Sequence, residues 1–133
     1  MCKIKWNDGI VHLSSFIEDN GVLCPIEFDI LPFIPKRIFY VTNVIRRDIR
    51  GQHAHFETEQ VLICLQGQIL VRTIDKNGTK THMLYPTDAI YIPKMVWDEQ
   101  EYCTGNDILL SICSTKYDKN DYINTIEELW SIK

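Results

Sequence analysis

The sequence predicts an all-β domain of the sandwich or barrel type, because short apolar segments recur about every ten residues and turn signals separate them. Glycines stand in the breaks at 66–68 and 75–78, and the Asn77-Gly78 pair readily supplies the positive φ angles of a tight hairpin turn. No helical periodicity interrupts the series, so we expect strands that pair directly with each other. The expected strands are rich in β-branched and aromatic residues and cover 38–45, 61–65, 69–74, 79–84, 89–92 and 108–113.

The two ends of the chain complete this pattern. The residues around His12, in the stretch 10–13, predict a short N-terminal strand. Near the C-terminus, apolar residues at 122, 123, 126, 129 and 130 fall on one helix face, so we expect a helix over 121–130. Such a helix covers either an open end of the barrel or a partner subunit, and the sequence leaves both open.

Length, charge and cysteine content narrow the class of protein. The chain has 133 residues, 45% of them hydrophobic, which suits one domain over 1–133 with its own core. A formal net charge of -4 argues against nucleic acid as a general partner, since phosphate binding needs a basic excess. No stretch approaches the roughly 20 apolar residues of a membrane helix, so no membrane partner is expected. Five cysteines without a CxxC pair indicate free thiols, and we expect a cytoplasmic protein.

The densest functional signal is the segment 50–55, which reads RGQHAH. Residues two apart in a strand point to the same face, so His53 and His55 are expected side by side. They face the interior of the barrel or, on a surface strand, the solvent. Histidine titrates near neutral pH, so two adjacent imidazoles in a cavity suit proton transfer. The other two histidines, His12 and His82, are expected to be ordinary strand residues.

This segment resembles the first cupin motif, in which a glycine leads to an HxH pair, an acidic ligand follows, and a later glycine, here Gly67, closes the hairpin. A metal-bearing cupin binds its ion with the two histidines, this acid and a late histidine. Here Gln60 holds the position of the acid and Asp98 that of the late histidine. Glu59 is one residue off, and a shift by one residue turns a strand side chain to the opposite face.

The resemblance implies a single-domain cupin, a jelly-roll β-barrel of the RmlC-like type with a short C-terminal helix. The altered ligand positions favour acid–base chemistry without a metal. A site of two histidines and the Asp98 carboxylate is the metal-binding alternative, if that carboxylate points inward.

A longer set of motifs extends along the chain: RIFY at 37–40, RGQHAH at 50–55, EQVL at 59–62, LQG at 65–67 and YDKNDYI at 117–123. Together they closely resemble one branch of the cupins, the sugar-nucleotide 3,4-ketoisomerases, which act on dTDP-4-keto-6-deoxyglucose. The resemblance implies an enzyme without cofactor: a proton leaves C3, an enediol forms, and C4 is reprotonated, which moves the ketone from C4 to C3. The product would feed an aminotransferase that makes a 3-amino-3,6-dideoxy sugar for surface glycans.

The same resemblance assigns roles to residues of this chain. The two catalytic histidines fall on His53 and His55, with His53 favoured as the base at C3. An orienting or proton-relaying tyrosine falls on Tyr40. Arg37 and Arg50 are expected to hold the diphosphate, because planar guanidinium groups suit phosphate oxygens.

Gln60, Trp97 and Asp98 complete the expected substrate-binding set. Trp97 either stacks on the thymine ring or packs into the wall of the barrel. Asp98 stands where the family more often has a histidine or an arginine, which leaves the C4 configuration of the product, galacto or gluco, open. A carboxyl group in a partly dry pocket also has a raised pKa. Two further departures are Phe56 and Asn124, where the family more often has lysine and arginine.

Other functions remain as alternatives. A cupin that binds or senses a sugar nucleotide without catalysis is the main one, since an altered pocket can lose chemistry and keep binding. A metal-dependent oxygenase and a 3,5-epimerase are further alternatives, although the epimerase pairs a histidine with a distant lysine, aspartate and tyrosine. The resemblance also implies a homodimer that exchanges N-terminal strands.

Overall fold

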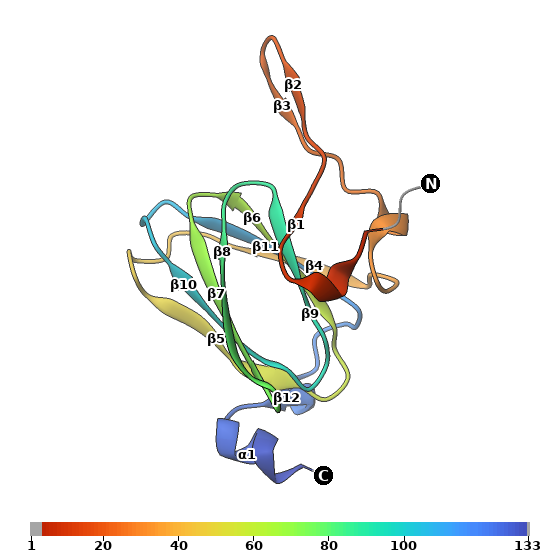
Figure 1. Ribbon diagram of the computed structural model, residues 1–133, viewed down its shortest axis with the longest axis vertical. Coiled ribbons are helices and arrows are strands. Elements are labelled where there is room, and N and C mark those ends of the chain that lie inside the picture. The colour runs from red at the N-terminus through yellow and green to blue at the C-terminus, as the bar shows by residue number, and fades with distance from the viewer. Residues whose placement is uncertain (1–3, 133) are drawn as a thin grey trace.

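In the computed structural model, which describes residues 4–132, two five-stranded antiparallel sheets face each other (Figure 1). No pairing among the described strands joins the two sheets, so the expected cupin barrel is built as a two-sheet jelly-roll sandwich. The first sheet has the order β1 (Val11–His12), β9 (Asp88–Ile92), β6 (Gln60–Gln66), β11 (Ile108–Cys113) and β4 (Arg37–Val41). The second has the order β12 (Tyr122–Ile123), β5 (Ile49–His55), β10 (Trp97–Tyr102), β7 (Ile69–Asp75) and β8 (Gly78–Leu84).

Apolar clusters lie on both faces of the first sheet. Leu62 and Cys64 of β6 belong to the cluster between the two sheets. Val61 and Ile63 of the same strand belong to a cluster on the outer face, which the N-terminal segment covers with Trp6. β6 is therefore buried on both sides, and this explains why its sequence is a continuous apolar run rather than an alternating one.

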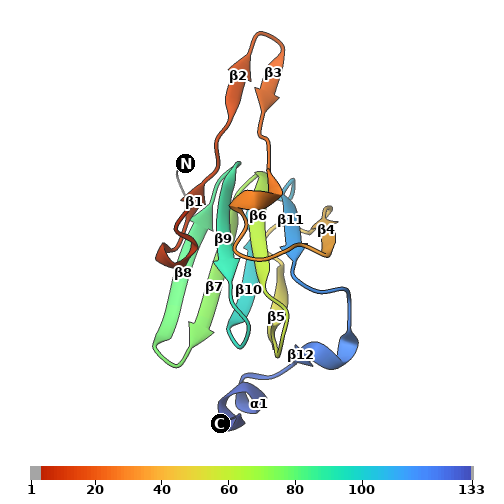
Figure 2. The same cartoon turned by 90° about the vertical axis from the view of Figure 1, so that its right-hand side faces the viewer.

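The N-terminal segment also forms a hairpin that stands clear of the sandwich. Its strands, β2 (Phe16–Glu18) and β3 (Gly21–Leu23), pair only with each other. Figures 1 and 2 show the hairpin projecting beyond the end of both sheets. Its apolar side chains are largely exposed, with Ile17 at 87% and Val22 at 64%. Nothing within residues 4–132 covers this apolar hairpin.

The C-terminal helix is shorter than the expected helix over 121–130. The helix α1 covers only Ile126–Ser131. It begins after Thr125, whose hydroxyl accepts a hydrogen bond from the backbone N–H of Glu128. The expectation is therefore wrong for 121–125. None of the helices in the described part of the chain is long and apolar enough to cross a membrane.

Residues just before this helix tie the C-terminal segment to β5. The single turn η3 (Lys119–Asp121) leads into β12, where Tyr122 pairs with His55 and Ile123 pairs with Ala54. Ile123 is completely buried, so its packing outweighs the helical pattern of the surrounding sequence. The pairing places Tyr122 directly beside the second histidine of the motif.

The expected strand over 38–45 is also too long. β4 ends at Val41, Asn43 has a left-handed φ of 61°, and Val44 turns into the cluster between the sheets. The other expected strands are confirmed, including the N-terminal strand at His12.

Candidate active site

A cavity of about 300 Å³ opens between the two sheets, where the edge strand β4 faces β5 and β10. Five of the expected site residues lie in its lining: two arginines, one tyrosine, one histidine and the glutamine that replaces the acidic ligand. The polar lining consists of Arg37, Tyr40, Arg50, His53, Gln60, Gln100 and Tyr122.

A bulge in β5 allows two of these residues to share the cavity face. Arg50 and His53 are three residues apart, and in a regular strand such residues point to opposite faces. The pairing between β5 and β10 shifts register at this point, which leaves Gln52 as an extra residue. Gly51 and Gln52 both have positive φ angles, 84° and 61°. The glycine before the histidine pair therefore helps an arginine and a histidine to converge on one cavity.

His53 and His55 project from the same face of β5. Their ring centroids are 4.8 Å apart and their planes are nearly perpendicular, at 83°. The Nδ1 atom of His53 lies 3.0 Å from the carbonyl oxygen of Gly51, which can only accept a hydrogen bond. Nδ1 therefore carries the proton of the neutral ring, and Nε2 keeps the free lone pair that can take up a proton.

Burial favours the neutral form of both imidazoles. Desolvation, together with the neighbouring His53 and Arg37, lowers the pKa of His55 to about 4, although Asp121 acts in the opposite direction. Desolvation also lowers the pKa of His53, against the effect of its hydrogen bond to Gly51. At neutral pH the pair is therefore unprotonated, which is the state that a general base needs.

Asp98 lies across from His53 in the β5–β10 ladder and is completely buried. One of its oxygens accepts a hydrogen bond from the amide of Gln100, whose own oxygen accepts one from the hydroxyl of Tyr102 at 3.3 Å. Its other oxygen, Oδ1, has no hydrogen-bond partner among the described residues. Burial raises the pKa of Asp98 to about 7. The structure thus puts a readily protonated carboxyl group beside His53, behind the residues that line the cavity.

The positions that hold metal in a metal-bearing cupin are occupied differently here. Gln60 is buried, and its amide nitrogen lies 3.7 Å from the sulfur of Cys113. The carboxylate of Glu59 instead accepts a hydrogen bond from the hydroxyl of Tyr91, which packs on the outer face of the first sheet. Within residues 4–132, no three His, Cys, Asp or Glu side chains come together as a possible metal site. The residues present therefore do not fit the four-ligand set of the cupin motif.

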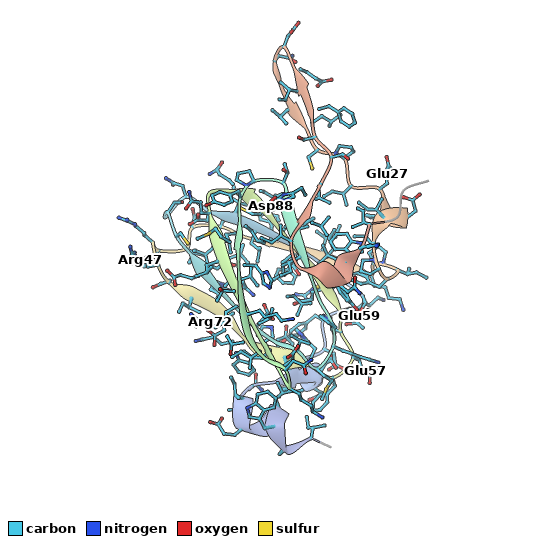
Figure 3. The ribbon with its side chains drawn as sticks, in the orientation of Figure 1. Glu27, Arg47, Glu57, Glu59, Arg72 and Asp88 are labelled. Atoms are coloured by element: carbon cyan, nitrogen blue, oxygen red, sulfur yellow. The ribbon has the colours of Figure 1, made fainter. Side chains whose placement is uncertain are left out.

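Positive charge reaches the cavity from both sheets. The guanidinium group of Arg37 lies over the rings of Phe39 and Tyr117, 4.7 Å and 5.3 Å from their centroids, so stacking restrains it at the cavity. Arg50 lines the same cavity from the opposite sheet. Arg47, in contrast, is exposed and points away from the body of the molecule (Figure 3). Arg37 and Arg50 thus form an arrangement that is able to hold phosphate oxygens.

Of the remaining expected site residues, Tyr40 lies at the edge of this cavity and Trp97 lies outside its lining. β4 alternates so that Arg37 and Phe39 face inward, while Tyr40 borders the cavity but directs a 70% exposed side chain to the other face. Trp97 packs with Ala54 on the outer face of the second sheet and does not line the cavity. In both cases the alternation of side chains along a strand turns the residue outward, and its neighbour, Phe39 or Asp98, faces inward.

Tyr122 is, with Gln100, one of two polar lining residues that the sequence analysis missed. Its ring centroid lies 4.8 Å from that of His53 and 4.6 Å from that of His55. The helical pattern over 121–130 concealed it. The signal that could have revealed it is the adjacent Tyr122-Ile123 pair, whose aromatic and β-branched side chains suit a strand.

Comparison with known families matches residues 6–133 to the family described as FdtA: WxcM-like, C-terminal. A curated relative is the TDP-4-oxo-6-deoxy-alpha-D-glucose-3,4-oxoisomerase of Aneurinibacillus thermoaerophilus. It is 32% identical over 116 residues, which cover 86% of this chain and 84% of the relative.

Solved structures agree with this match. QdtA, a sugar 3,4-ketoisomerase from Thermoanaerobacterium thermosaccharolyticum in complex with TDP, has a TM-score of 0.85 and 34% identity over 92% of this chain and 90% of its own. A histidine-to-asparagine mutant of QdtA in complex with TDP-4-keto-6-deoxyglucose has a TM-score of 0.87 and 32% identity, over 96% and 94% of the two chains. The rmlC epimerase of Mycobacterium tuberculosis is only 11% identical and shares the fold alone, with a TM-score of 0.75 over 85% of this chain and 66% of its own.

Proposed function

The chain belongs to the FdtA family of sugar-nucleotide 3,4-ketoisomerases, and we propose that it converts dTDP-4-keto-6-deoxyglucose to the dTDP-3-keto-6-deoxyhexose. The observation that carries this proposal is a pair of neutral imidazoles whose centroids are 4.8 Å apart: His53 lines the cavity, and His55 is buried beside it. Moving a ketone to the adjacent carbon requires proton transfer at two neighbouring atoms. Two imidazoles on one strand face can serve both atoms.

The reaction removes one proton from C3 and delivers one to C4. A hydrogen next to a ketone is acidic enough for a neutral imidazole to remove when the developing enolate oxygen receives a hydrogen bond. We assign the base at C3 to His53, because its Nε2 atom keeps the free lone pair. The hydroxyl proton of C3 passes to the C4 oxygen in the enediol, and the histidine pair returns a proton to C4. The ketone then stands at C3, and no atom of the substrate is lost.

We assign the diphosphate of the substrate to Arg37 and Arg50, which approach the cavity from opposite sheets. Gln60 and Gln100 supply amide groups to the same lining.

A 3-keto sugar nucleotide is a substrate for an aminotransferase. We therefore propose that the reaction belongs to the synthesis of a 3-amino-3,6-dideoxy sugar.

We propose that the enzyme works without a metal ion or other cofactor and in the cytoplasm. The neutral Gln60 in place of an acidic ligand supports the first point. The cysteines within residues 4–132 are free thiols, as a reducing compartment keeps them, and this supports the second. Cys2 lies outside the described residues.

We further propose that the protein is a homodimer. The exposed apolar hairpin supports this, because Phe16, Ile17, Val22 and Leu23 are between 53% and 87% exposed. An isolated two-stranded hairpin is marginally stable in water, and a second copy of the chain that receives it would bury these side chains. Sedimentation is expected to give twice the chain mass of 15.6 kDa, and a particle of 15.6 kDa contradicts the proposal.

Incubation with dTDP-4-keto-6-deoxyglucose in D₂O tests the function. We expect deuterium at C3 of recovered substrate and at C4 of product, and a product that a 3-aminotransferase accepts. Activity should survive treatment with a chelator, whereas stoichiometric iron, manganese or nickel with loss of turnover on its removal contradicts the metal-free reaction. Tight dTDP binding in calorimetry without any exchange would instead support a cupin that senses a sugar nucleotide.

A further inference from the structure

Tyr122 joins the histidine pair from a separate strand. Its ring makes angles of 61° with His53 and 59° with His55, at the short centroid distances given above. Because Tyr122 pairs with His55 in the ladder between β12 and β5, strand pairing fixes this contact. The three rings therefore form one cluster in which each ring contacts the other two.

Hydrogen bonds next to Tyr122 hold β12 firmly against β5. The carboxylate of Asp121 accepts hydrogen bonds from the backbone N–H groups of Glu57 and Thr58, at 2.8 Å and 3.0 Å. The carbonyl oxygen of Asp121 accepts one from the N–H of Phe56 at 3.0 Å. On the other side of Tyr122, Ile123 is completely buried. The tyrosine ring thus stands between two anchored residues and can restrain the rotation of the imidazoles that it contacts.

Water exclusion lowers the pKa of the two histidines more than neighbouring charges do. Arg37 disfavours a proton on His55 and Asp121 favours one, but desolvation is the largest cause of its lowered pKa. The tyrosine ring lies against that imidazole and keeps water from one of its sides. The titratable and charged groups that face the pair from other elements are Arg37, Asp98, Asp121 and Tyr122. Tyr117 packs against the far side of this group, with its ring centroid 6.0 Å from that of Tyr122.

We propose that Tyr122 is a positioning residue of the active site, whose aromatic ring rather than its hydroxyl group holds the two imidazoles in their mutual orientation and keeps water from them. The kinetic consequence rests on the proposed ketoisomerase function. The effect on the histidines does not, because their titration can be measured without substrate.

Two substitutions separate the ring from the hydroxyl. Tyr122→Phe keeps the ring, and we expect kcat within about threefold of the parent enzyme, with unchanged histidine titration. Tyr122→Leu removes the ring, and we expect kcat to fall about 10- to 100-fold with a smaller change in KM, since the loss is one of orientation. In NMR titrations of the leucine variant, the pKa of His55 should rise from about 4 toward 6.5. The acidic limb of the pH–rate profile should move to higher pH with it, because the histidine pair then takes up a proton at a higher pH.

Tyr85→Leu is the matched control, because Tyr85 is 51% exposed in the turn between β8 and β9. It should change neither kcat nor the histidine titration. Tyr122→Met preserves side-chain length without a ring, and it replaces the leucine variant if that variant fails to fold.

Equal losses in Tyr122→Phe and Tyr122→Leu would assign the role to the hydroxyl and overturn the proposal. Unchanged titration in a folded variant without the ring overturns it as well. If the parent enzyme itself lacks turnover, the proposed function fails, and the titrations still decide the role of the ring.

Discussion

The cavity at His53 and a second hollow beside β8 both place a histidine next to a cationic side chain. The second hollow, here called the β8 hollow, is lined by Asp75, Lys80 and His82 and is larger, at about 460 Å³ against about 300 Å³. Size alone would therefore favour the β8 hollow over the cavity at His53. The two differ instead in how their histidines are held.

At the cavity, His53 forms a cluster with the buried His55 and with Tyr122, and Gly51 fixes the tautomer of His53. In the β8 hollow, His82 packs against the N-terminal segment, where a Cβ atom added to Gly9 would lie 3.4 Å from the imidazole. Desolvation and the adjacent Lys80 lower the pKa of His82 too. A lowered histidine pKa is thus common to both places. The active site differs because two imidazoles contact each other there, and because the proton of His53 is fixed on its Nδ1 atom.

The largest expected effect tests this comparison directly. His53→Asn and His55→Asn should each lower turnover of dTDP-4-keto-6-deoxyglucose by at least roughly 100-fold, because each removes a proton-transfer group. Binding of dTDP, measured by calorimetry, should stay within a few-fold of the parent. His82→Asn makes the same substitution in the β8 hollow and should leave turnover unchanged. Near-parental turnover in either variant of the pair removes that histidine from the mechanism, and a large loss in His82→Asn would move the site to the β8 hollow.

Much of the fold follows from local sequence signals. Turn residues such as Asn77-Gly78 mark the hairpin between β7 and β8, and β-branched runs mark the strands on either side. The same-face position of His53 and His55 follows from the period of two alone. The hairpin at 16–23 was harder to foresee, because its apolar side chains find no core within residues 4–132.

The site could be predicted less completely, because its details depend on register and on long-range pairing. A shift of one residue along β4 would direct the side chain of Tyr40 inward in place of that of Phe39, and no local signal sets this register. The extra residue Gln52 puts the side chains of Arg50 and His53 on the same face of β5, and only the pairing of β5 with β10 shows that this residue is extra. Tyr122 reaches the pair through a strand that the apolar periodicity over 121–130 assigns to a helix. The residues with which this strand pairs lie far away in the sequence, so no local pattern shows the pairing.

The smallest expected effect concerns Asp98, the completely buried carboxyl group opposite His53, which has no counterpart beside His82 among the described residues of the β8 hollow. Burial raises its pKa from 3.8 to about 7, so the folded state holds this proton more tightly than the unfolded state does. Between these two pH values the folded protein binds more protons than the unfolded chain does. The contribution of Asp98 to the free energy of unfolding therefore falls as the pH rises. Asp98→Asn removes this titration and keeps an oxygen that can accept the hydrogen bond of Gln100. Relative to the parent, the variant should gain a few °C in Tm when the pH rises from about 5 to about 8. Asp75→Asn, in the lining of the β8 hollow, should show the same difference in Tm at both values. Parallel pH dependence of the parent and Asp98→Asn would mean that Asp98 is ionised in the folded protein, and the active-site cavity would then have a charged carboxylate beside His53.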